Sequence, residues 1–79
     1  MIPLSELKVG VLATVQSMDV EKTVNQRLMA FGLVPGTNVR IGHIAPLGDP
    51  ISVHFGAQSV MLRRRDAKNV IVNPIEESK

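Results

Sequence analysis

Glycine and proline punctuate residues 27–50 closely, and their order constrains the backbone path more than any other feature of the chain. The segment Phe31-Gly32-Leu33 is typical of a helix end, because glycine readily takes the left-handed conformation that closes a last helical turn. With Gly32 in that role, Leu33 should touch Leu28 in a Schellman cap. Pro35-Gly36 suits the two central positions of a type II turn. These signals specify backbone geometry rather than catalytic chemistry.

The residues before Gly32 predict a single α-helix. Asp19 is a suitable N-cap, and the helix should run from about residue 20 to residue 31. Its apolar side chains recur at steps of four, four and three, at Val20, Val24, Leu28 and Phe31. This spacing gives one apolar stripe that should face the core, with Asn25 off the stripe.

Short segments of alternating apolar and polar residues predict five strands. They lie at about 11–16, 39–42, 51–55, 59–64 and 70–72, and a single helical turn is expected within 2–7. Four strands in succession with short connections should pair antiparallel, and so short a sheet must curl to bury its core. The expected fold is mainly β: an SH3-like small barrel of about five antiparallel strands, with one α-helix after the first strand.

Length and composition narrow the function classes. The 79 residues predict one domain over residues 1–75, followed by a polar C-terminal tail at 76–79 that frays. The chain has no cysteine, which excludes disulfides and thiolate metal sites. A net charge of +2 is too small to indicate a nucleic-acid binder by itself. We find neither a secretory signal nor an apolar run long enough to cross a bilayer, so a cytoplasmic location is expected.

Three motifs together resemble the FeoA family. They are L-x-x-x-G-L-x-P-G-x-x-V at 28–39, A-P-L-G-D-P-I-x-V at 45–53, and L-R-x-x-x-A-x-x-V-x-V at 62–72. The resemblance spans nearly the whole chain. It implies an SH3-like fold and a small cytosolic accessory of the bacterial ferrous-iron transporter FeoB, which is a membrane protein with a cytosolic GTP-binding domain.

An accessory protein must dock by some surface, so we look for residues that simple folding does not require. The candidate partner-binding residues are Arg27, Met29, Leu47 and Asp49. Leu47 and Asp49 lie in the A-P-L-G-D-P loop, and a turn does not demand a leucine. The loop and Met29 also have structural interpretations: the loop can be a rigid hairpin connection, and Met29 can be peripheral core.

Arg63, Arg64 and Arg65 form the one run of like charge. Such a run can be a solvated strand edge that discourages edge-to-edge pairing. It can also contact an acidic partner, a phosphate or anionic lipid headgroups. Binding to single-stranded nucleic acid is the weakest option, because Phe31 and Phe55 are the only aromatic side chains available for stacking.

His43 and His54 are weak candidates for a metal site, with Asp49 as a third ligand. Strand alternation predicts that His43 points inward and His54 outward, so the two could not chelate one ion. A β-bulge would remove this objection, because one extra residue reverses the parity. We therefore expect no metal and no cofactor. Catalysis is not expected either, because the chain has no phosphate-binding loop and no nucleophile elbow.

The sequence thus favours a non-catalytic cytosolic interaction module that docks on FeoB and supports or regulates ferrous-iron uptake. One alternative is a protein that binds ferrous or other transition-metal ions for delivery or sensing. A second is a nucleic-acid-binding module on the SH3-like scaffold. Insertion into the membrane is not expected, and self-association stays open.

Overall fold

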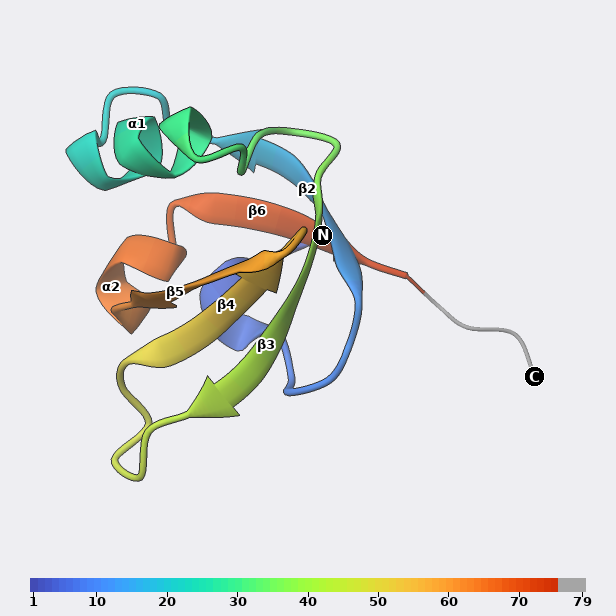
Figure 1. The fold of residues 1–79 in the computed structure, drawn as a ribbon, viewed down its shortest axis with the longest axis vertical. Helices are drawn as coiled ribbons and strands as arrows, with labels where there is room; N and C mark the ends of the chain where they lie inside the picture. The colour runs from blue at the N-terminus through green and yellow to red at the C-terminus, as the bar shows by residue number, and fades with distance from the viewer. Residues whose placement is uncertain (76–79) are drawn as a thin grey trace.

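The computed structural model describes residues 1–75, which form one six-stranded antiparallel sheet and two short α-helices (Figure 1). The strands are β1 (Ile2–Pro3), β2 (Ala13–Met18), β3 (Asn38–Ile44), β4 (Ile51–Phe55), β5 (Gln58–Leu62) and β6 (Val70–Pro74). The helices are α1 (Thr23–Ala30) and α2 (Arg64–Ala67), and a 3₁₀ turn, η1, covers Leu4–Glu6. The strand order is β1-β6-β2-β3-β4-β5, so β1 and β5 are the edges of an open sheet.

The mainly β architecture and the antiparallel pairing are confirmed, but the expected element count is wrong. The described residues contain six strands, because Ile2 and Pro3 pair with Val72 and Ile71 as a short β1. The expected single helix follows the second strand, β2, and is joined by a second helix, α2. The strand expected at 59–64 ends at Leu62 in the structure, and α2 begins at Arg64.

The start of α1 also differs from the prediction. The carboxylate of Asp19 accepts a hydrogen bond from the backbone N–H of Glu21 at 3.1 Å. The backbone carbonyl of Asp19 accepts one from the backbone N–H of Lys22 at 3.2 Å. These bonds form a turn ahead of the helix, so α1 starts at Thr23 with Lys22 as its N-cap. Asp19 is therefore a turn residue and not the helix cap.

The core is largely aliphatic, with Phe55 as its one aromatic member among residues 1–75, and lies inside the curled sheet. Alternation along β3 and β4 correctly predicts its centre, since Val39, Ile41, Ile51, Val53 and Phe55 are all buried. Fully buried side chains from outside the sheet, Leu4 of η1, Leu33 after α1 and Ala67 of α2, add to it. Neither helix within residues 1–75 has the length and apolarity that a membrane span requires. The tail predicted at 76–79 lies outside the described residues.

Candidate functional site

The end of α1 is fixed by the predicted Schellman cap. The N–H of Leu33 donates to the carbonyl of Leu28 at 3.0 Å, and the N–H of Gly32 donates to the carbonyl of Met29 at 3.0 Å. Gly32 has φ +103°, a conformation that side-chain-bearing residues rarely adopt. The predicted turn after it is also confirmed, with Gly36 at φ +95° and a bond from Thr37 N–H to the Val34 carbonyl. These bonds set where the last helical residues point.

A buried amide holds α1 against the sheet. Asn25 is fully buried, contrary to its predicted place off the apolar stripe. Its Nδ2 donates to the carbonyls of Asp19 at 2.9 Å and Asn69 at 3.2 Å. Asn25 thereby ties the helix to the turn before it and to the turn before β6. Among the described residues its Oδ1 has no hydrogen-bond partner.

A groove with apolar walls lies between α1 and β5. Its floor is formed by buried Leu28 and Leu62, and its sides by half-buried Val24 and Val60. Two large apolar side chains stand open to solvent at its margins, Phe31 at 59% exposure and Met61 at 60%. The predicted helix stripe is therefore wrong at its end: Phe31 borders this groove instead of entering the core.

Charge around the groove is predominantly positive. Arg27 lines the groove from α1, and Arg63 and Arg65 line it from the segment that enters α2. Asp66 is the one acidic side chain among the lining residues. The margin also includes an edge strand, because among the described residues β5 pairs only with β4. A groove of this kind combines apolar contact with attraction for an acidic partner.

The A-P-L-G-D-P loop, which joins β3 to β4, is anchored to α2. The carboxylate of Asp49 accepts a hydrogen bond from the backbone N–H of Arg64 at 2.9 Å. The Arg64 side chain in turn donates through Nε to the Gly48 carbonyl and through a terminal nitrogen to the Ser5 carbonyl. Leu47 stands apart from this network, with 97% of its surface exposed. The loop is therefore a fixed structure that presents one leucine to solvent.

The three consecutive arginines consequently do not form one patch. Arg64 points back onto the loop and η1, whereas Arg63 and Arg65 are exposed at the groove. The charge available to a partner is contributed by Arg63 and Arg65, together with Arg27 across the groove. The interpretation of the run as a strand edge is wrong, because Arg64 and Arg65 are helical.

A bulge in β3 changes the prediction for the histidines. Ile41 pairs with Val53 and His43 pairs with Ser52, so Gly42 is an extra residue on β3. The extra residue reverses the alternation, and His43 is exposed rather than inward. His43 and His54 thus share the outer face of β3 and β4. Asp49 lies in the loop between β3 and β4, where its side chain accepts a hydrogen bond from Arg64.

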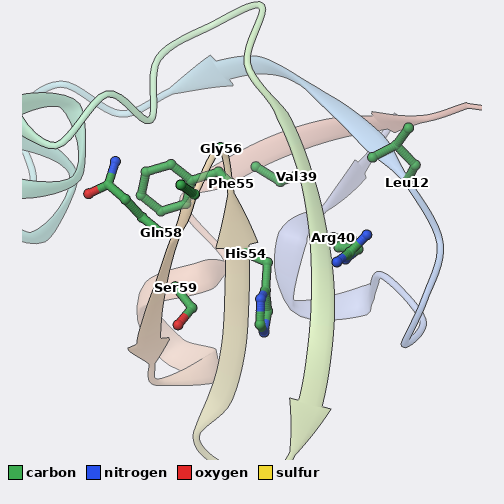
Figure 2. Close-up of a pocket in the computed structure, with 9 residues that line it drawn as sticks. Leu12, Val39, Arg40, His54, Phe55, Gly56, Gln58 and Ser59 are labelled. Atoms are coloured by element: carbon green, nitrogen blue, oxygen red, sulfur yellow. The ribbon is translucent and has the colours of Figure 1, made fainter.

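A second pocket, open to solvent, lies around the turn from β4 to β5. Figure 2 shows the ring of His54 between β3 and β4, with Arg40 on the neighbouring strand and Gln58 near the turn. The side chain of Gln58 donates to the Phe31 carbonyl at 2.8 Å. This bond connects the β4–β5 turn to the end of α1.

The structure separates the four predicted partner contacts. Arg27 and Met29 belong to α1 at one end of the molecule, while Leu47 and Asp49 belong to the β3–β4 loop at the opposite end (Figure 1). Arg27 lines the groove, and Met29 is half-buried. The four cannot contact one small partner surface together.

Sequence reasoning missed the two most exposed apolar members of the groove. The helical spacing predicts that Phe31 belongs to the apolar stripe, although Phe31 directly precedes the glycine that ends the helix. The sequence does contain a signal for Met61. It directly precedes Leu62, whose side chain the strand pattern places inward, so the side chain of Met61 should point outward. A large apolar side chain at an outward strand position indicates a contact surface more often than a core.

The fold and these surfaces define a small, mainly β domain whose distinctive features are external grooves and loops. The model of the FeoA domain matches residues 2–74. The chain therefore belongs to the FeoA family.

Relatives of known description agree with this assignment. The chain is 32% identical over 72 residues to the putative Fe(2+) transport protein A of Campylobacter jejuni, covering 91% of this chain and 97% of that protein. It is 31% identical over 75 residues to a fusion of Fe(2+) transport protein A with the Fe(2+) transporter FeoB in Porphyromonas gingivalis. That match covers 95% of this chain and 9% of the fusion protein.

A solved structure supports the fold. FeoA of Stenotrophomonas maltophilia, crystallised with zinc and described as an SH3 domain protein, superimposes with a TM-score of 0.81 at 32% identity. The match covers 92% of this chain and 91% of that one. The chain is thus an SH3-like member of a family linked to ferrous-iron transport.

Proposed function

We propose that this protein is a non-catalytic interaction module that docks on the cytosolic side of FeoB and supports or regulates ferrous-iron uptake. The observation that carries the proposal is the groove between α1 and β5, with exposed Phe31 and Met61 at its margins. The Porphyromonas gingivalis fusion, which joins a related domain to FeoB in one chain, supports the choice of partner.

The groove suits a segment of FeoB that carries both apolar and acidic side chains. Phe31 and Met61 offer contact area, and aromatic and methionine side chains are enriched in protein interfaces. Arg27, Arg63 and Arg65 would attract the acidic side chains and set the orientation of docking. The alternative docking surface is the loop between β3 and β4, where the side chain of Leu47 is exposed.

Docking can alter transport only through unequal affinity for two FeoB conformations. Tighter binding to one conformation raises the population of that conformation. The conformational equilibrium shifts by the difference in binding free energy between the two conformations. The fixed ends of α1 and β5 suit this role, because a pre-organised surface loses little conformational entropy when it binds.

The test is co-purification of this protein with FeoB from the same organism, with and without guanine nucleotide. Phe31→Glu and Met61→Glu should each weaken the complex at least about tenfold, because they place a carboxylate in a desolvated apolar contact. Leu47→Glu is the matched control, since it makes the same change at the opposite, fully exposed end. If Leu47→Glu abolishes binding and the groove variants do not, the loop is the docking surface; absence of any complex with the unaltered protein overturns the proposal.

A further inference from the structure

The outer face of β3 and β4 brings both histidines of the chain to one place. Because Gly42 is an extra residue on β3, Gly42 and His43 both lie opposite Ser52. His54 follows Ser52 by two positions on β4, so its side chain leaves the same face. The bulge is therefore what converts two opposed histidines into neighbours.

The ring of His54 extends across the bulge. A Cβ placed on Gly42 would lie 2.2 Å from Nε2 of His54 and 2.5 Å from its Cδ2. The imidazole of His54 thus occupies the space that a side chain at position 42 would fill. Figure 2 shows the ring lying between the two strands.

Ser52 links the two histidines. Its Oγ lies 3.1 Å from Nε2 of His54, and its Cα pairs directly with that of His43. Directly paired residues of an antiparallel sheet have Cβ atoms about 4.5–5.5 Å apart. The Nε2 atom of His54 therefore lies beside Ser52 and over Gly42, and these are the cross-strand partner of His43 and its neighbour along β3.

We propose that His43 and His54 together bind a divalent late-transition-metal ion, with Zn²⁺ as the representative ion. Imidazole nitrogens bind such ions at about 2.0–2.1 Å, and neutral imidazole is a ligand that zinc, copper and nickel accept. Within residues 1–75 no group of three His, Cys, Asp or Glu side chains gathers. The site thus supplies two protein ligands, and water completes the coordination.

The surroundings determine how tightly the site binds. Arg40 pairs with His54 across the strands, and its positive charge opposes a bound cation. Binding to Nε2 also replaces the contact between His54 and Ser52. Both effects make this site weaker than a four-ligand structural zinc site, so bound zinc exchanges readily with solution.

The experiment is a titration of the full chain with Zn²⁺, followed by calorimetry and by the imidazole ¹⁵N resonances. One ion should bind per monomer, and the resonances of both rings should shift together. His43→Ala and His54→Ala should each lower the affinity at least about tenfold. Gly42→Ala should lower it comparably while keeping both histidines, because the added methyl group displaces the His54 ring.

Ser52→Ala is the matched control, because it removes the neighbouring hydroxyl and leaves both ligands; binding should persist. Thermal unfolding of each variant separates loss of the site from loss of the fold. Sedimentation velocity with Zn²⁺ should show monomers. Binding that survives His43→Ala, shifts of one ring alone, or zinc-dependent dimers would each overturn the proposal.

Discussion

The carboxylate of Asp49 caps helix α2 by accepting the backbone N–H of Arg64 at 2.9 Å, from a loop fifteen residues earlier in the chain. The first N–H groups of a helix have no partner inside it, and Arg63, the N-cap residue of α2, makes no side-chain bond to them. The loop therefore supplies what the local sequence lacks. This relationship gives the A-P-L-G-D-P segment a structural role that does not depend on partner binding.

Asp49→Ala should destabilise the protein by about 1 kcal/mol, the usual effect of losing a helix-capping side chain. The reason is the unsatisfied N–H of Arg64 at the start of α2. Urea denaturation of the two proteins measures the difference. Leu47→Ala in the same loop is the control and should change stability by less than about 0.5 kcal/mol, because Leu47 is almost fully exposed.

Arg64 should contribute more than its two neighbours. Its guanidinium bonds the carbonyls of Gly48 and Ser5 and so joins the loop, α2 and η1. Arg64→Leu leaves these carbonyls without their charged donor, and we expect a loss of about 2–3 kcal/mol. Arg65→Leu, at an exposed position one residue later, should be nearly neutral. Equal effects of the two substitutions in thermal unfolding would refute the structural role assigned to Arg64.

Local signals correctly predict the end of α1 and the turn after it, where the interacting atoms are close in sequence, although the same kind of signal misplaces the helix start at Asp19. The Schellman cap involves Leu28 and Leu33, and the type II turn spans residues 34–37, so short patterns determine both. The cap of α2 depends on Asp49, which no pattern around Arg64 reveals. The same holds for the functional surfaces, because the groove combines side chains from α1 with side chains from β5.

The bulge at Gly42 shows a second kind of limit. Its glycine is visible in the sequence, but whether a strand contains an extra residue depends on the register of its partner. When the pairing of His43 with Ser52 is not known, simple alternation places the His43 side chain on the wrong face of the sheet. The burial of Asn25 is similar, since one of its two acceptors, the Asn69 carbonyl, lies 44 residues away.

Asn25→Ala should lower the free energy of unfolding by about 1–3 kcal/mol. The substitution removes a fully buried amide and leaves the carbonyls of Asp19 and Asn69 without its two hydrogen bonds. Gln26→Ala is the matched amide control: the Gln26 side chain is exposed and within residues 1–75 bonds only the Val20 carbonyl, so its loss should matter little. Denaturant midpoints for both variants check the difference, and a larger effect at Gln26 would contradict it.

The exposed groove residues should be dispensable for folding. Phe31→Ser and Met61→Ser should each change the free energy of unfolding by less than about 0.5 kcal/mol, because both side chains are already more than half exposed. Leu28→Ala is the contrasting variant from the floor of the same groove. It should cost about 2–5 kcal/mol, since it removes buried methyl groups and leaves a cavity. Urea denaturation measures all three. A large loss at Phe31 or Met61 would mean that these side chains stabilise the fold, and that their exposure gives no reason to assign them to a partner.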